Sequence, residues 1–235
     1  MHSRVRWWTE QSIDWFIRAS SYTDYHEVLA KHIIDNLNQD VVTKEKVVCK
    51  SVLELGCGLG YQAEALYRYG FDVQAYDINL LVIQKAKERT KLNIFHQADA
   101  SEVDGLYDAV LCINYGHILE PSGLSALMAH AKKRLIYVIS RHNAHGTDTR
   151  EDKTESIKNL LRSAGYQFSV REICLNFDQP LKSMEEALEF INFTYLGRNT
   201  ESYLRFVEKS GYEDYPYIFR NKKSIVLFSI NRILF

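Results

Sequence analysis

The sequence predicts an α/β fold in which a parallel β-sheet is covered by helices. The first observation is that, from Val47 onward, short apolar runs alternate with longer segments whose apolar residues recur every three or four positions. This alternation is typical of strands that are connected by helices. The second observation is the apolar run from Ser224 to Ile233, whose pattern suits a strand buried on both faces.

The composition fits one globular domain that spans residues 1–235. Of the 235 residues, 46% are hydrophobic, 25% are charged and 12% are aromatic. A single core commonly serves a chain of this length. Within this domain we expect an N-terminal helical cover at 1–45, a ligand-binding core at 46–176, a helical insertion at 180–212 and a final strand at 222–235.

The charge balance and the cysteines indicate which partners and which cellular compartment to expect. Lys and Arg total 29 against 30 Asp and Glu, so there is no basic excess for a phosphate backbone and nucleic acid is a disfavoured partner. The four cysteines form no C-x-x-C pair, and no stretch resembles a signal peptide. These features predict reduced thiols in a cytoplasmic protein. No membrane partner is expected, because no segment approaches the roughly 20 apolar residues of a spanning helix, and a monomer or a homodimer fits equally well.

Each element follows from its local pattern. The first 40 residues have helical periodicity, and this periodicity returns between Ser183 and Gly211, which predicts two inserted helices. The helix after the first strand should stop at Gly70, because glycine tolerates the left-handed conformation at a helix C-terminus. The expected strands are Val47–Leu55, Phe71–Tyr76, Asn93–Gln97, Tyr107–Ile113, Arg134–Ser140, Gln167–Ile173 and Ser224–Ile233; the expected helices between them are Tyr61–Tyr69, Leu80–Lys91, one after Pro121, and Lys153–Ser163.

The most informative stretch is the apolar run from Val52 that leads into Gly56, Gly58 and Gly60. Glycines at a strand-to-helix turn let the backbone approach a ligand and leave amide groups at the helix start free to contact it. The spacing is G-x-G-x-G and not the G-x-G-x-x-G of dinucleotide-binding turns. Glu54 beside the glycines suits a cofactor with a sulfonium and an ammonium better than a pyrophosphate.

Two further acids follow the next two strands. Asp77 closes the second strand, where an acid can accept hydrogen bonds from ribose hydroxyls. Asp99 follows the third strand, where it could accept a hydrogen bond from an exocyclic amine. Either acid alone is more often a helix cap or a loop residue than a ligand contact. Together with Glu54 they indicate one ligand, because sheets of this kind bind ligands beyond the carboxyl ends of their strands.

At these residues the chain resembles a known family, the class I S-adenosylmethionine-dependent methyltransferases. The run Glu54–Gly60 resembles motif I of the family, Asp77 its ribose-binding acid and Asp99 its adenine-contacting acid. The resemblance covers roughly residues 47–173 and resumes at the final strand. It implies a three-layer, Rossmann-like, seven-stranded sheet with the last strand antiparallel, and it implies S-adenosyl-L-methionine as cofactor and S-adenosyl-L-homocysteine as product.

The resemblance also implies a set of cofactor-binding residues. In the family, the residue after the ribose-binding acid packs on the adenine, and the residues after the fourth strand border the methionine end of the cofactor. Carried onto this sequence, the set is Glu54, Gly56, Cys57, Gly58, Gly60, Asp77, Ile78, Asp99, Ala100, Asn114 and Tyr115.

The methyl acceptor should meet side chains that follow the fourth and fifth strands. His117 and His142 occur there, and a histidine can take a proton from an attacking hydroxyl, amine or thiol near neutral pH. Either could instead be an ordinary loop residue, since positioning supplies much of the rate of such transfers. The residues Tyr22, Tyr25 and His26 are candidates for a lid or for substrate contact, although the N-terminal aromatic residues could simply pack a helix on the sheet. No dependable metal site is predicted.

Several functions stay open. The favoured one is methyl transfer to a small-molecule acceptor, on an oxygen, nitrogen, sulfur or carbon atom that the sequence does not specify. An RNA or protein methyltransferase is the main alternative within the enzymes. A non-catalytic S-adenosylmethionine-binding regulatory module would keep the same acids, and a nicotinamide-dependent oxidoreductase is disfavoured by the glycine spacing.

Overall fold

The computed structural model describes residues 7–41, 43, 45–116, 118, 120–141, 153–196 and 199–232. The chain divides into two compact units, which are described separately below. The sheet unit comprises His26–His142, Asp148–Ile173 and Ser224–Phe235. The aromatic unit comprises Met1–Tyr25, Asn143–Thr147 and Cys174–Lys223.

The sheet has seven strands in the order β3-β2-β1-β4-β5-β10-β6. Strands β1 to β5 pair in parallel, and β10 runs antiparallel to β5, between β5 and β6. The predicted fold, including the antiparallel last strand, is therefore confirmed. The strands are β1 (Ser51–Leu55), β2 (Asp72–Asp77), β3 (Phe95–Gln97), β4 (Tyr107–Ile113), β5 (Ala131–Arg141), β6 (Phe168–Asn176) and β10 (Lys222–Asn231).

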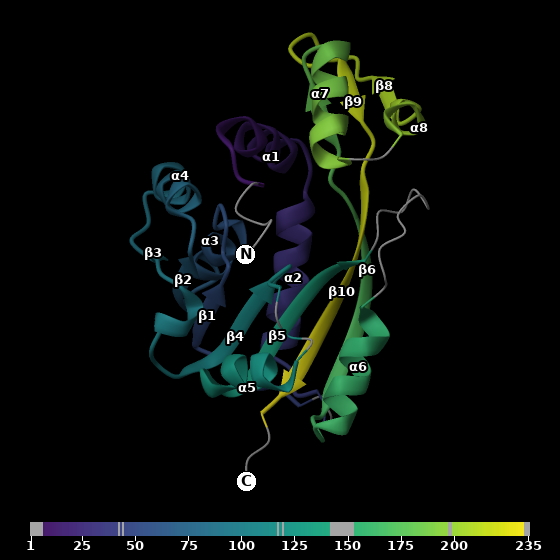
Figure 1. Cartoon of the computed structure of the whole chain (residues 1–235). Helices are drawn as coiled ribbons and strands as arrows, with labels where there is room; N and C mark the ends of the chain where they lie inside the picture. Colours follow the sequence, from purple (N-terminus) through teal and green to yellow (C-terminus); the bar gives the residue numbers. More distant parts are fainter. Residues whose placement is uncertain are drawn as a thin grey trace. The chain divides into compact units, whose positions relative to one another are not determined.

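Helices cover both faces of this sheet. One face packs Leu53 and Leu55 of β1 against α5 (Pro121–Ala129) and α6 (Thr154–Ser163) in a single buried cluster. Successive side chains of a strand point to opposite faces, so Glu54 points to the other face. That face carries α3 (Tyr61–Arg68), whose Ala63 amide hydrogen bonds to the Glu54 carboxyl. Figure 1 shows α5 and α6 on the near side of the strands and α2 (Tyr25–Leu37) on the far side.

The ends of the elements differ from the predicted ones by a few residues. The first strand begins at Ser51 and not at Val47, and Val48 in the excluded part is more than half exposed. Helix α3 ends at Arg68, and Gly70 just beyond it has a φ of +91°, in keeping with its predicted role as a stop. Helix α4 (Leu80–Thr90) is capped by Asn79, whose side chain accepts a hydrogen bond of 2.9 Å from the Leu81 amide.

The aromatic unit contains helices and a second, small sheet. The two predicted inserted helices are present as α7 (Met184–Thr194) and α8 (Thr200–Leu204). Before and after this pair of helices lie three strands that the sequence did not predict, paired antiparallel in the order β7-β9-β8. The remaining elements are α1 (Glu10–Tyr22), β7 (Gln179–Leu181), β8 (Val207–Lys209) and β9 (Tyr217–Phe219).

A buried ion pair helps to hold the aromatic unit together. The Arg18 guanidinium is buried and donates to the Glu186 carboxylate at 2.9 and 3.0 Å, and it also pairs with Asp14. Trp15 donates its indole N–H to the same Glu186 at 3.1 Å. Because Arg18 and Trp15 belong to α1 and Glu186 to α7, these bonds join the N-terminal helix to the inserted one.

The structure also bears on the cysteines and on the expected absence of a membrane-spanning helix. The four cysteines form no disulfide, and three of them are buried. Among the residues that the structure describes, no helix combines the length and the apolar character needed to cross a membrane.

Candidate functional site

The site is built on the turn between β1 and α3. Gly56, Gly58 and Gly60 have φ values of +73°, +53° and +73°, a region in which side chains other than that of glycine are strained. The amides of Gly56 and Cys57 donate to the Tyr76 carbonyl at 2.8 and 3.0 Å. These bonds fasten the turn to the end of β2. The turn follows β1, and strand order reverses between β1 and β4, which is where such sheets form their ligand crevice.

Glu54 lies directly before this turn and is 2% exposed. Its Oε2 atom has no hydrogen-bond partner among the described residues. Burial raises the pKa of the carboxyl to about 8, the Ala63 amide opposes this shift, and the nearby Asp77 adds to it. A buried carboxyl with an unused oxygen is costly in a native protein, which marks Glu54 as a candidate for ligand contact.

Asp77 connects the end of β2 to the glycine turn. One carboxylate oxygen accepts a hydrogen bond of 2.9 Å from the Gly58 amide, and the other accepts one of 2.9 Å from the Asn79 amide. Burial raises the pKa of Asp77, while these two bonds act in the opposite direction. Each carboxylate oxygen has a second lone-pair position, so Asp77 can still accept hydrogen bonds from a ligand.

The residues after β2 and β3 are more exposed. Ile78 is 62% exposed, which is unusual for an isoleucine and offers an apolar surface beside Asp77. Asp99 is exposed and begins the 3₁₀ helix Ala100–Glu102, where it accepts hydrogen bonds from the Ser101 amide at 2.9 Å and the Ser101 hydroxyl at 2.7 Å. These bonds lower the pKa of Asp99. Asp99 thus acts as a cap, and a capping role leaves lone pairs on the carboxylate for a ligand.

The segment after β4 also meets the glycine turn. Asn114 has a φ of +51°, and its side chain accepts a hydrogen bond of 2.7 Å from the Ser140 amide. The Tyr115 ring lies so close to Gly56 that a Cβ atom on Gly56 would be 2.9 Å from it. Strained backbone outside glycine is often found at functional sites, and here the strained residue connects the ends of β4 and β5.

The structure therefore brings together the predicted residues at the carboxyl ends of β1, β2 and β4. The two histidines predicted to act on the acceptor, His117 and His142, lie outside the described residues. Of the lid candidates, Tyr25 is buried against Phe177 with ring centroids 4.8 Å apart, and burial raises its pKa to about 12. Tyr22 packs on Tyr212 within the aromatic unit. Their contact with substrate stays a prediction.

A ring stack at the start of α3 could not be recognised from the sequence. The His26 ring stacks on the Tyr61 ring with centroids 4.2 Å apart, and the Arg89 guanidinium lies 3.9 Å from the centre of the same Tyr61 ring. Arg89 also pairs with Glu64 and donates to the Leu59 carbonyl at 3.1 Å. Burial, followed by the Arg89 charge, lowers the pKa of His26 to about 3. The stack holds α2, α3 and α4 around the turn, and its members are far apart in the chain.

Comparison with known proteins identifies the family. Residues 23–196 match the methyltransferase-domain family, which is well over half of the chain. The chain belongs to the methyltransferase-domain family, and the resemblance found in the sequence is confirmed. No curated protein sequence matches the chain.

Solved structures of methyltransferases share the fold. Magnesium protoporphyrin IX methyltransferase from Synechocystis PCC 6803 with bound S-adenosylhomocysteine is 15% identical, with a TM-score of 0.56 over 96% of this chain and 97% of that one. The same enzyme with bound S-adenosylmethionine gives 16% identity and a TM-score of 0.51 over 89% and 79% of the two chains. A putative methyltransferase from Bacillus halodurans C-125 gives 15% identity and a TM-score of 0.52 over 87% and 99%.

Proposed function

We propose that this chain binds S-adenosylmethionine and transfers its methyl group to an acceptor. The observation that carries the proposal is the buried Glu54 carboxyl, which has an oxygen without a partner among the described residues directly before a turn of three glycines. A cofactor with a sulfonium and an ammonium group would give this carboxyl a positive charge, which none of the described residues is found to place there. The Synechocystis neighbour holds the same cofactor and its product, which supports the proposal.

The remaining residues fit the other parts of the cofactor. Asp77 would accept hydrogen bonds from the ribose hydroxyls, and the exposed Ile78 would pack on the adenine, with Asp99 and Ala100 at its edge. Asn114 and Tyr115 would border the methionine end together with the glycine turn, which includes Cys57. When bound, the cofactor would supply a methyl group on a positively charged sulfur to a lone pair of the acceptor, and S-adenosyl-L-homocysteine would leave as the sulfur–methyl bond breaks. The chain's own contribution is to hold both partners in position for this transfer.

Calorimetric titration tests the cofactor proposal. The intact protein is expected to bind both S-adenosylmethionine and S-adenosylhomocysteine. Asp77→Ala is expected to lower the affinity for both ligands about 10-fold to 100-fold, because hydrogen bonds to a charged group contribute roughly 1.5–3 kcal/mol each. Asp72→Ala is the matched control, since Asp72 is an exposed acid at the opposite end of the same strand. Equal binding by both variants, or no binding of either ligand to the intact protein, would contradict the proposal.

We further propose that the acceptor is a small molecule. The formal net charge of −1 provides no basic surplus for a nucleic acid. The Synechocystis neighbour is named for a small-molecule acceptor, which is compatible with this proposal without being specific. The predicted roles of His117 and His142 as a base or an orienting group belong to this step and stay predictions.

Transfer of a labelled methyl group separates the competing functions. A cell extract is incubated with the protein and methyl-labelled S-adenosylmethionine, and then divided into small molecules, RNA and protein. We expect the label above background in the small-molecule fraction. Label in RNA or protein would indicate the alternative acceptors, and cofactor binding without any transfer would indicate a regulatory module.

A further inference from the structure

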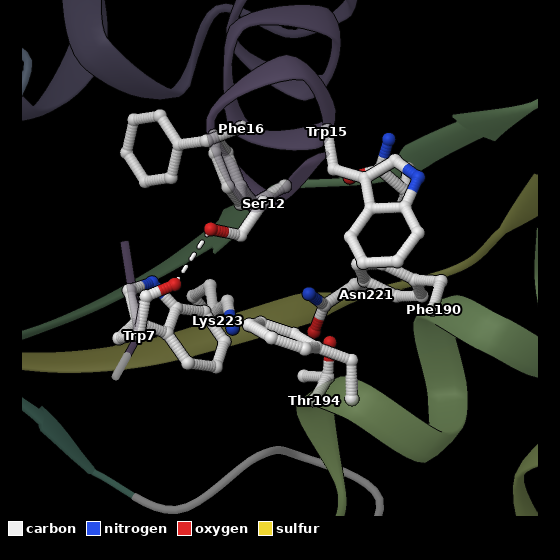
Figure 2. Close-up of a pocket in the computed structure, with 11 residues that line it drawn as sticks. Trp7, Ser12, Trp15, Phe16, Phe190, Thr194, Asn221 and Lys223 are labelled. Atoms are coloured by element: carbon white, nitrogen blue, oxygen red, sulfur yellow. Dashed lines mark hydrogen bonds between the residues drawn. The ribbon is translucent and has the colours of Figure 1, made fainter. Parts of the chain in front are cut away.

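The aromatic unit contains a pocket of its own, shown in Figure 2. It encloses about 60 Å³ and lies among residues of α1, β7, α7 and the segment that leads into β10. Most of its wall is aromatic. The six rings that line it are those of Trp7, Trp15, Phe16, Phe177, Phe190 and Phe193.

The aromatic wall is held in place by contacts within the unit. Trp15 packs on Phe190 and Phe193 with ring centroids 5.4 and 5.7 Å apart, and its indole N–H is used by Glu186. Trp7 packs on Phe193 at 5.2 Å, and its carbonyl accepts a hydrogen bond of 2.6 Å from the Ser12 hydroxyl. Most of the wall is therefore formed before any ligand arrives. Trp7 is the most exposed of the six rings, at 43%.

Two polar atoms of this pocket have no hydrogen-bond partner among the described residues. They are the Oδ1 atom of Asn221 and the Oγ1 atom of Thr194, and both are buried. Asn221 is 3% exposed; its backbone amide donates to the Asp178 carboxylate at 2.8 Å, and its backbone carbonyl accepts a hydrogen bond of 2.7 Å from the Phe177 amide. Figure 2 shows the side-chain oxygens of both residues on the same side of the pocket. A buried polar atom without a partner costs roughly 1–3 kcal/mol of stability. A ligand that hydrogen bonds to these two oxygens would remove this cost.

We propose that this pocket binds a small, uncharged, planar molecule that carries one O–H or N–H donor at its edge. The donor would bond to the Asn221 oxygen, and the Thr194 hydroxyl would bond to the same polar group. The volume of the pocket is less than half that of a cavity of roughly 150 Å³ that holds a benzene molecule. Only the edge of the ligand that carries the donor would therefore enter, and the rest of its ring would stack on Trp7. Lys223 also lines the pocket, and its positive charge disfavours a cationic ligand. This inference goes beyond methyl transfer and needs no cofactor.

Phenol and anisole serve as a pair of probes, because they share a ring and anisole carries a methyl group in place of the hydroxyl hydrogen that phenol donates. Binding is followed by NMR of the tryptophan indole N–H signals, of which the chain has three. We expect phenol to shift the Trp7 and Trp15 signals in a saturable way and to bind at least 5-fold more tightly than anisole, because anisole leaves the Asn221 oxygen unsatisfied. Signals that do not shift with phenol, or equal affinities for the two probes, would overturn the proposal and leave an ordinary hydrated cavity.

Substitutions identify the residue that reads the donor. Asn221→Leu is expected to remove the preference for phenol over anisole, while Asn192→Leu, an exposed asparagine of the neighbouring α7, should leave it unchanged. Thr194→Val nearly preserves the shape of the side chain and is the second test if Asn221→Leu does not fold; it should reduce the preference. A preference that survives both Asn221→Leu and Thr194→Val would overturn the assignment.

Discussion

Replacing Gly60 by alanine is expected to destabilise the protein far more than replacing Gly165, although the two residues have nearly the same backbone conformation. Their φ values are +73° and +75°, so the left-handed region costs each alanine a similar amount, about 1–2 kcal/mol. The surroundings differ. A Cβ atom on Gly60 would lie 2.6 Å from Cζ of Phe95 and closer still to Cε1, whereas Gly165 has no atom within 4 Å of that position.

The excess cost of Gly60→Ala should come from Phe95, which is fully buried at the start of β3. Forcing a methyl group into a packed core costs roughly a further 1–3 kcal/mol. Chemical denaturation of the two variants measures the difference, and Phe95→Leu in the Gly60→Ala background should recover part of the loss by removing the ring. Equal losses of stability for Gly60→Ala and Gly165→Ala would contradict the close packing of Phe95 on the glycine turn.

This packing illustrates what the sequence could and could not predict. The order of elements follows from local periodicity, and the glycine turn follows from a short motif, so both were recognisable. The requirement for glycine at position 60 has a second, non-local cause, because Phe95 lies 35 residues further along the chain. The stack of His26, Tyr61 and Arg89 was missed for the same reason, since no spacing rule relates residues on three different helices.

The small sheet of the aromatic unit was missed for a different reason. Its strands β7, β8 and β9 have three residues each, which is too short for an alternating pattern to be read. The segment around α7 and α8 was long enough, and its helices were predicted. The pocket atoms on Asn221 and Thr194 that find no hydrogen-bond partner among the described residues carry no sequence signal, because this property depends on which residues surround them in the fold.

The acids of the candidate site show how far position alone can be trusted. Glu54, Asp77 and Asp99 all follow or end strands as predicted, but the structure gives them unlike surroundings. Glu54 is buried, with one oxygen that no described residue pairs with; Asp77 accepts hydrogen bonds from two amides, and Asp99 is an exposed helix cap. Burial, hydrogen bonds and neighbouring charges together set the pKa of each acid, and all three depend on the packed fold.

Glu54→Gln is expected to remove a large pH dependence of stability. Burial raises the pKa of Glu54 from 4.5 to about 8, so between these values the folded state binds more protons than the unfolded state. The contribution of Glu54 to the free energy of unfolding is fully present below pH 4.5 and is lost as the pH rises through 8. The loss is at most about 1.4 kcal/mol per pH unit. Denaturation from pH 5 to 8.5 should therefore show a steeper decline for the intact protein than for the variant. The lowered pKa of His26 changes the pH dependence of stability only below pH 6.5, the ordinary pKa of histidine, and it does so in the intact protein and in the variant alike.

The same carboxyl should couple cofactor binding to proton release. At pH 7 the free protein holds Glu54 mainly in its protonated form, whereas a bound sulfonium and ammonium would favour the ionised form. Binding of S-adenosylmethionine to the intact protein is then expected to release close to one proton, measured as the dependence of the calorimetric heat on the ionisation enthalpy of the buffer. Glu54→Gln subtracts any proton that the ligand itself exchanges. Equal proton release by both proteins would show that Glu54 does not face the charged part of the cofactor, even if the ligand binds, and would return the role of this buried acid to the packing of α3 on β1.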